Sequence, residues 1–136
     1  MYDYIIKNGM IVTGDGSKPF LGDLAISGNK IVKIGKLIQE LAVTVINAEG
    51  KYVTPGFIDI HRHGDTALFL DSFGELEVRQ GLTTIINGNC GLSVVPCPEK
   101  YRDEIFNFLR PVIGNVETKE VFDDFSSYVK VVEKQN

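Results

Sequence analysis

The hydrophobic pattern of the chain changes at Pro55-Gly56, and this change restricts the possible folds more than any other feature. Before this point, short alternating or β-branched runs are separated by Gly and Asn, which is typical of strands joined by tight turns. After it, Phe57–Ile60 is almost continuously apolar, as in a parallel strand covered on both faces. A length of 136 residues suits about one ordinary domain. The pattern predicts a mixed β and α/β chain, with a β-rich portion at 1–54 and an α/β portion at 55–136.

The β-rich portion contains two dipeptides that tolerate the positive φ angles of a hairpin turn, and each is flanked by short strands. The two expected turns are Asn8-Gly9 and Gly28-Asn29. The expected strands are Tyr2–Lys7, Met10–Val12, Asp23–Ser27, Lys30–Gly35, Val43–Asn47 and Lys51–Thr54. Together they predict a small antiparallel β layer.

The α/β portion begins with one predicted strand–helix–strand unit. A weak helical pattern covers residues 66–80 and would be ended by Gly81, after which Leu82–Asn87 resembles a second buried strand. Two further helices are predicted, one from Pro98 to Pro111 and one over about 119–134. Their apolar stripes are interpreted as faces that pack against the core. The stripes are Tyr101, Ile105, Phe108 and Leu109, followed by Phe122, Phe125, Tyr128, Val129 and Val132.

Charge and composition exclude several classes of function. With 14 basic and 18 acidic residues the net charge is −4, so we expect neither nucleic acid nor an anionic membrane surface as a partner. The first residues lack a basic segment followed by an apolar one, and we expect no export signal or membrane anchor. Only two cysteines occur, too few for a disulfide-stapled scaffold, which favours the cytoplasm.

The only two histidines, His61 and His63, stand two positions apart just after the predicted strand at 57–60. Residues i and i+2 of a strand project from the same face, so both imidazoles would point together, with Asp59 behind them. Two imidazoles aimed at one point are a natural pair of metal ligands. The alternative is a chance pair of surface or hydrogen-bonded histidines. Their place at the carboxyl end of a parallel strand, where α/β enzymes bind ligands, favours the metal site.

Cys90 follows the next predicted strand and lies between glycines, so it is placed at the same edge of the sheet. A thiolate is a good zinc ligand, although a small buried cysteine is the common alternative. Cys97, between two prolines, is interpreted as structural. Asp65 is either a turn residue or an acid that supports the site.

Other acidic and glycine-rich segments suggest no further site. The segment Gly14-Asp15-Gly16 is predicted to be a turn, because no helix or phosphate-binding lysine follows it. The pairs Lys119-Glu120 and Asp123-Asp124 are predicted to lie on the solvated face of the last helix.

These segments resemble a known family. Val53–His63 (VTPGFIDIHRH) and Gln80–Ile86 are similar to the opening of the metal-dependent amidohydrolase superfamily. Asn87–Ser93 (NGNCGLS) narrows the resemblance to the N-acyl-D-amino-acid deacylases, or D-aminoacylases, and Phe122–Glu133 is similar to their next helix. The resemblance implies the N-terminal part of a small β-sandwich, followed by the first βα units of an incomplete (β/α)₈ TIM barrel.

The resemblance also implies a site and a reaction. His61 and His63 would bind one metal site, and Cys90 would ligate zinc where many relatives use a carboxylated lysine. Zinc, one or two ions in the complete enzyme, would polarise the amide carbonyl of an N-acyl-D-amino acid and lower the pKa of a water molecule. The activity would be that of a hydrolase of non-peptide C–N bonds. The residues expected to support the ligands are Asp59, Asp65 and Asn89.

Two alternatives stay open at this point. A cyclic-amide hydrolase of the same superfamily, such as a dihydropyrimidinase or dihydroorotase-like enzyme, would share the His-x-His strand but not the GNCG segment. A non-catalytic binding or assembly module derived from the truncated fold is the second alternative. The presence of Cys90 distinguishes the deacylase from the first alternative. Measurements of metal content and activity would distinguish it from the second.

A TIM barrel takes about 250 residues, so the segment 56–136 has room for only two strands and their helices. We therefore expect the general base and the remaining ligands to lie beyond Asn136, and the chain alone to be inactive. Purification can remove zinc from so incomplete a site. We also expect self-association, or a chain that supplies the rest of the barrel, to cover the unpaired apolar faces.

Overall fold

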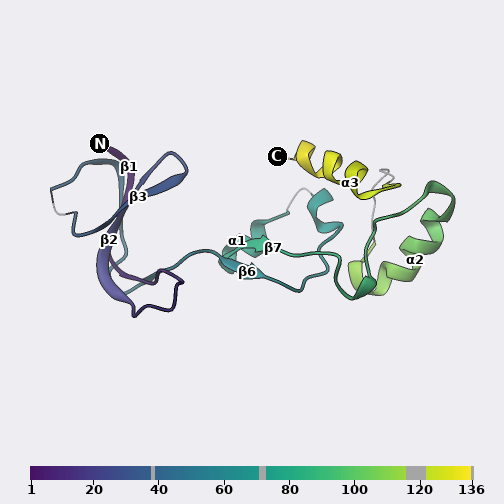
Figure 1. The fold of residues 1–136 in the computed structure, drawn as a ribbon, viewed down its shortest axis with the longest axis horizontal. Coiled ribbons are helices and arrows are strands. Elements are labelled where there is room, and N and C mark those ends of the chain that lie inside the picture. Colours follow the sequence, from purple (N-terminus) through teal and green to yellow (C-terminus); the bar gives the residue numbers. More distant parts are fainter. Residues whose placement is uncertain (38, 71–72, 116–121, 136) are drawn as a thin grey trace. The chain divides into compact units, whose positions relative to one another are not determined.

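The computed structural model describes residues 1–37, 39–70, 73–115 and 122–135. The chain divides into two compact units, Met1–Pro55 and Gly56–Asn136, which are described separately (Figure 1). Within the described residues, no helix is both long and apolar enough to cross a membrane.

The first unit is a single five-stranded sheet with the strand order β3-β2-β1-β4, in which β5 also pairs with β1. Strand β1 pairs antiparallel with β2 but parallel with β4 and β5, so the predicted antiparallel layer is wrong and the sheet is mixed. The hairpin at Gly28-Asn29 is confirmed, because β2 and β3 pair antiparallel on either side of it. The strands are β1 (Tyr2–Ile11), β2 (Phe20–Ser27), β3 (Lys30–Gly35), β4 (Ala42–Asn47) and β5 (Tyr52–Val53).

The hairpin predicted at Asn8-Gly9 is wrong. Strand β1 runs through both residues, and its register against β2 shifts between Ile6 and Gly9. Asn8 takes the predicted positive φ, 61°, and its N–H donates to Asp23 at 2.9 Å. A Cβ on Gly9 would come within 2.5 Å of Val53 Cγ2. Asn8 and Gly9 therefore form a bulge in a central strand. Because Gly9 has no side chain, β5 can pack close to β1 at this position.

A buried carboxylate joins the sheet to the loop after β3. Asp23 is 7% exposed, and it accepts N–H bonds from Asn8 at 2.9 Å and from Leu37 at 2.7 Å. Burial alone raises the pKa of this carboxyl, but the two N–H donors and the charge of Lys7 outweigh it and lower the pKa overall. The adjacent core contains Ile5, Ala25 and Leu37.

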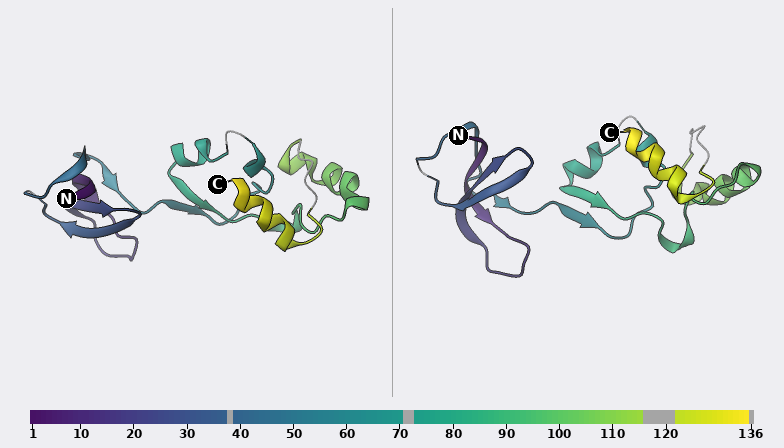
Figure 2. Two further views of the ribbon diagram at one scale, coloured as in Figure 1. Left: turned by 90° about the horizontal axis from the view of Figure 1, so that it is seen from above. Right: turned by 45° about the horizontal axis from the view of Figure 1, so that its top comes forward.

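The second unit starts with the parallel pair β6 (Phe57–Asp59) and β7 (Leu82–Ile85), which lie side by side in all views (Figures 1 and 2). This confirms the predicted parallel pair. Both strands are shorter than predicted, and they are not covered on both faces, since Ile58 is 61% exposed. The described residues form neither a closed barrel nor a two-sheet sandwich.

The single helix predicted over 66–80 is wrong. The segment contains a 3₁₀ turn, Ala67–Phe69, and a short helix α1, Glu75–Arg79. Gly74 precedes α1 with a φ of 87°, outside the right-handed helical region, so no helix continues through it. Gly81 follows α1, as predicted, with a φ of 82°.

Two longer helices complete the unit: α2 (Arg102–Ile113), preceded by a 3₁₀ turn at Glu99–Tyr101, and α3 (Phe125–Val132). Helix α2 contains Pro111 instead of ending there, and it stops at Gly114, whose φ is 77°. A proline near the last turn removes only one hydrogen bond, whereas Gly114 takes a positive φ that glycine tolerates and that ends the helix.

Helix α3 begins later than predicted, with Asp124 as its N-cap in a capping box with Ser127. Asp123 and Asp124 are exposed, as predicted, but both precede the first residue of the helix. The pair Lys119-Glu120 lies outside the described residues.

The core of the second unit gathers Val94, Leu109 and Phe122. Phe122 lies before α3 and forms a β-bridge with Cys97. The helical stripes are only partly core, since Phe108 and Phe125 are 72% and 69% exposed.

Candidate metal centre

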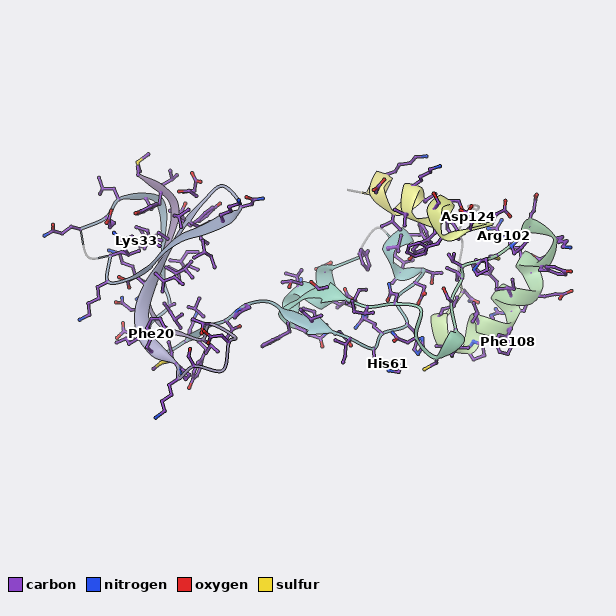
Figure 3. All side chains as sticks on the ribbon, viewed as in Figure 1. Phe20, Lys33, His61, Arg102, Phe108 and Asp124 are labelled. Atoms are coloured by element: carbon purple, nitrogen blue, oxygen red, sulfur yellow. The ribbon has the colours of Figure 1, made fainter. Side chains whose placement is uncertain are left out.

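The described structure brings His61, His63 and Cys90 together. One ligand atom from each lies within 4.8 Å of the other two, and His61 Nε2 is 3.1 Å from Cys90 Sγ. The imidazole rings have centroids 5.6 Å apart and planes at 74°. Strand β6 ends at Asp59, so the histidines converge from the segment just after the strand rather than from the strand itself. Figure 3 marks His61 at this end of the pair.

Backbone pairing continues beyond the two strands and sets the spacing of this segment. Ile86 N–H donates to the Asp59 carbonyl at 2.8 Å, and Arg62 N–H donates to the Ile86 carbonyl at 3.2 Å. Cys90 then lies in a tight turn, with a φ of 59° between Gly88 and Gly91, whose φ angles are 77° and 68°. Three of the four residues from Gly88 to Gly91 have a positive φ, which turns the chain sharply and places Cys90 Sγ against His61.

Two asparagine side chains tie the ends of the strands together. Asn89 Nδ2 donates to the carbonyls of Arg62 at 3.1 Å and Ile86 at 2.7 Å. Asn87 Oδ1 accepts the N–H of Gly64 at 3.1 Å. Asn89 was a predicted supporting residue, whereas the sequence analysis did not single out Asn87. The position of Asn87 at the end of a predicted strand could have indicated that it lies near the site.

Asp59 and Arg62 hold the histidine segment in place from its other side. Asp59 Oδ1 accepts the backbone N–H of His61 at 3.1 Å, and its other oxygen lies 3.9 Å from Arg62 Nη1. Arg62 also forms an ion pair with Glu77 of α1. This ion pair fixes the strand end to the helix, and no sequence motif marked it in advance.

Asp65 is 3% exposed and lies in a turn. Its carbonyl accepts the hydroxyl of Tyr128 at 2.9 Å, which joins the loop after His63 to α3. Its Oδ2 is buried without a hydrogen-bond partner among the described residues. Burial first, and then the charge of Asp65, raise the pKa of Tyr128 to about 12.

The two cysteines differ in their surroundings. Cys97 is 1% exposed, and burial raises the pKa of its thiol, so it is inert as a nucleophile or ligand. This agrees with its interpretation as structural. Cys90 is exposed at the strand edge.

The donor set suits zinc. Two imidazole nitrogens and a thiolate are common zinc ligands, with bonds of about 2.0 to 2.3 Å that separate tetrahedral donors by roughly 3.5 Å. The separations of 3.1 Å between His61 and Cys90, and of at most 4.8 Å within the trio, need only small adjustments.

Comparisons with known proteins agree with this geometry, although no family model matches the chain. Over 109 residues the chain is 37% identical to an N-acyl-D-aspartate deacylase of Alcaligenes xylosoxydans xylosoxydans, covering 80% of this chain and 22% of that protein. It also matches the crystal structure of N-acyl-D-glutamate deacylase from Bordetella bronchiseptica, with a TM-score of 0.77 and 31% identity over 99% of this chain and 27% of that one. That structure contains zinc and a phosphonate mimic of the tetrahedral intermediate. An L-hydantoinase from Arthrobacter aurescens matches 64% of this chain and 20% of its own, with a TM-score of 0.51 and 30% identity.

These likenesses relate the chain to the amidohydrolases, a class of hydrolases built on the TIM barrel. Within that class, its homologues and structural neighbours are the N-acyl-D-amino-acid deacylases, as the sequence resemblance indicated. The chain spans only a fifth to about a quarter of the length of these relatives, between 20% and 27%.

Proposed function

We propose that this chain is part of a zinc-dependent amidohydrolase that hydrolyses the amide bond of N-acyl-D-amino acids. The observation that carries the proposal is the convergence of His61, His63 and Cys90 within 4.8 Å at the carboxyl ends of two parallel strands. Ligands gather at this edge in α/β enzymes because every strand end points toward it. The zinc and the tetrahedral-intermediate mimic bound by the Bordetella relative support the same assignment.

A bound zinc ion would supply Lewis-acid polarisation of the amide carbonyl and a lowered pKa for water. His61, His63 and Cys90 hold the ligand atoms. Asn89 keeps the two strand ends at fixed separation through its bonds to Arg62 and Ile86, as outer hydrogen bonds do in metal sites generally. We assign proton transfer to an aspartate in the rest of the protein.

The deacylase is favoured over a cyclic-amide hydrolase by Cys90. The segment that contains it makes the sharp turn required to reach His61, through Gly88 and Gly91. The wider extent of the match to deacylases, 99% of the chain against 64% for the hydantoinase, points the same way.

Metal binding tests the proposal directly. Cobalt(II) titrated into the reduced chain is expected to give a thiolate-to-cobalt absorption band that zinc displaces. Cys90→Ser should remove the band, and His61→Ala should weaken binding by about 10-fold or more, as losing a ligand costs at least what losing its hydrogen-bonded support costs. Cys97→Ala is the matched control, because this thiol lies in the core. A band that disappears with Cys97 and survives in Cys90→Ser would contradict the site.

We further propose that the chain alone does not hydrolyse N-acyl amino acids at an enzymatic rate. Three ligands without a general base or a closed pocket leave the water and the developing charge unsupported. Turnover by the purified chain that is abolished by a chelator and by His61→Ala would refute this. The complete enzyme should prefer N-acyl-D-amino acids to their L forms.

We propose the cytoplasm as the location of this enzyme. Cys90 must stay reduced to serve as a thiolate ligand, and both cysteines are free in the structure. Fractionation of the source cells with an antibody against the chain tests the location.

A further inference from the structure

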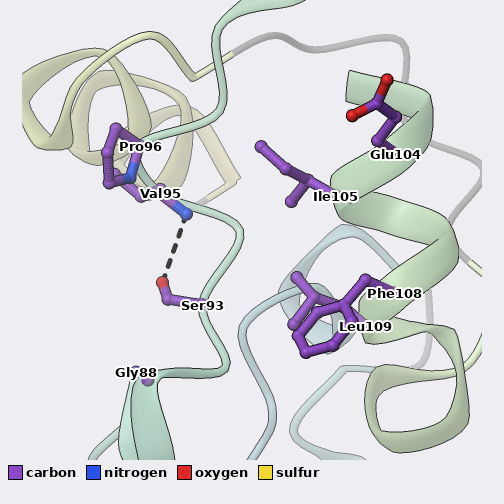
Figure 4. Close-up of a pocket in the computed structure, with 9 residues that line it drawn as sticks. Gly88, Ser93, Val95, Pro96, Glu104, Ile105, Phe108 and Leu109 are labelled. Carbon is purple, nitrogen blue, oxygen red and sulfur yellow. Dashed lines mark hydrogen bonds between the residues drawn. The ribbon is translucent and has the colours of Figure 1, made fainter. Parts of the chain in front are cut away.

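A second feature adjoins the candidate metal centre. A cavity of about 580 Å³ lies between the segment Gly88–Pro96 and helix α2 (Figure 4). This volume falls within the range of sites for small molecules, about 300 to 1,000 Å³. Figure 4 shows Phe108, Leu109 and Ile105 of α2 on one side and Ser93 and Val95 on the other. Both walls belong to the second unit.

The cavity reaches the backbone on either side of Cys90. Gly88 and Gly91 both line it, and neither carries a side chain that would close this end. Cys90 itself directs its sulfur to His61 at 3.1 Å. The turn therefore places the candidate ligands and the cavity within a few residues of each other.

The walls discriminate between the two halves of an N-acyl amino acid. Val95, Ile105, Phe108 and Leu109 are apolar, and Glu104 is the one charged residue among the described lining residues. A cavity that holds a carboxylate and no cation disfavours the carboxylate of the amino acid, because like charges repel and desolvation is uncompensated. The acyl half carries no charge and gains from leaving water.

We propose that this cavity binds the acyl chain of the substrate and that Phe108 sets the length of chain accepted. The proposal rests on the deacylase function proposed above. Leu109 is 2% exposed and belongs to the core, so it forms a fixed floor. Phe108, 72% exposed, borders the same space without serving the core, so its size can vary at little cost to the fold.

Binding of N-acetyl-, N-hexanoyl- and N-octanoyl-D-alanine to the zinc-loaded chain, followed by NMR, tests this proposal. Affinity is expected to rise with chain length by up to about fourfold per buried methylene, with shifts at Gly91 and Phe108. Phe108→Trp should reduce the octanoyl advantage at least threefold, and Phe108→Ala should reduce the gain per methylene. The matched control is Phe57→Ala, because Phe57 is also more than half exposed, at 56%, but lies on β6 and does not line this cavity.

A charge comparison gives a second readout. The adipoyl compound has the carbon count of the hexanoyl compound and a terminal carboxylate, so Glu104 should weaken its binding. Glu104→Gln should restore part of this loss, and its effect on the adipoyl compound should exceed its effect on the hexanoyl compound.

Affinity that is independent of acyl length, or equal effects of the Phe108 and Phe57 variants, would overturn the acyl cavity. Cobalt binding is measured on metal-free portions of the same preparations, so the two proposals fail separately. If affinity does not depend on acyl length but cobalt still binds, the acyl cavity is refuted and the metal site is retained. If cobalt does not bind but affinity still depends on acyl length, the proposed deacylase function is refuted.

Discussion

At the scale of single residues, Cys90 combines a candidate ligand with an unfavourable backbone conformation. Its φ of 59° lies in the left-handed region, which costs a non-glycine residue about 1 to 2 kcal/mol. Such a conformation persists where the surrounding structure demands it, often at functional sites. Here the demand is the turn that brings the thiol to His61.

Replacing Cys90 should therefore separate stability from metal binding. Cys90→Gly relieves the strained φ and is expected to leave stability unchanged or raise it by up to about 1 kcal/mol. Cys90→Val, with a branched Cβ, should lower it by about 1 to 2 kcal/mol. Both variants should lose the cobalt–thiolate band. Urea unfolding of the three proteins measures the differences, and equal losses in Gly and Val would argue against strain at this position.

Tyr128 provides a titration that reports the contact between α3 and the loop after His63. Its pKa of about 12 lies above the ordinary value of about 10, so the folded state favours the neutral phenol. This contribution to stability is complete below about pH 10 and is lost as the pH rises through about 12. An ultraviolet absorbance titration should show one of the five tyrosines ionising late. Asp65→Asn should lower that pKa, and Tyr128→Phe should remove the late step.

At the scale of elements, Asp23 connects three segments of the first sheet. Asp23→Asn keeps the size of the side chain but turns an NH₂ group toward an N–H donor, which leaves a buried polar group unsatisfied. The expected loss is about 1 to 3 kcal/mol. Because the folded pKa of Asp23 is lowered, the advantage of the wild type exists above the unfolded pKa of about 4 and vanishes as the pH falls through the folded value.

Chemical denaturation of both proteins at pH 7 and at successively lower pH measures this difference. Glu49→Gln is the matched control, since this carboxylate is exposed in a turn of the same unit. If the difference in the free energy of unfolding between the wild type and Asp23→Asn does not depend on pH, the charge of the carboxylate is excluded as its source.

The cap of α3 can be tested independently. Asp124 accepts the N–H of Ser127 at 2.7 Å, while Ser127 Oγ lies 3.3 Å from Asp124 N. Asp124→Ala should lower the protection of the Ser127 amide against hydrogen exchange and reduce helix content, because the first helical N–H groups lose their acceptor. Asp123→Ala, one residue earlier and also exposed, should change neither. Equal effects at both positions would show that the cap does not stabilise α3.

Local chemistry explains which elements were predictable. Gly28-Asn29 and Asn8-Gly9 have the same residue types, but only the first forms a hairpin. Asn8 is held instead by Asp23, which is 15 residues away, and a single sequence does not reveal such a partner. In contrast, the convergence of His61 and Cys90 was predictable, because each residue follows one of two neighbouring parallel strands. The Asn87 contact with Gly64 depends on side-chain geometry that no spacing specifies.

At the scale of the whole molecule, the second unit exposes a large apolar surface. The relatives of this chain are several times longer, so they have additional segments that can cover the corresponding surface. The parallel pair β6 and β7 has no further strand beside it in the described residues. Several large apolar side chains of this unit outside the proposed acyl cavity are more than half exposed, namely Phe57, Ile58, Ile60, Leu70, Leu76, Val78 and Phe125. Burying each is worth about 1.5 to 3 kcal/mol, which in sum rivals the stability of a small domain.

This surface predicts that the chain associates at micromolar concentration, either with itself or with a chain that supplies the rest of the barrel. Sedimentation velocity should show species larger than a monomer. Ile58→Lys combined with Ile60→Lys should shift them toward the monomer, because a charge on each of two exposed positions opposes contact between the apolar faces. Val43→Lys with Val45→Lys is the matched control on the first unit, where both valines are also exposed. Adding the barrel segment of a related deacylase should replace self-association by a mixed complex and protect β7 from hydrogen exchange. A stable wild-type monomer in which α2 and α3 are already protected would contradict this prediction and favour a rearranged module that needs no barrel.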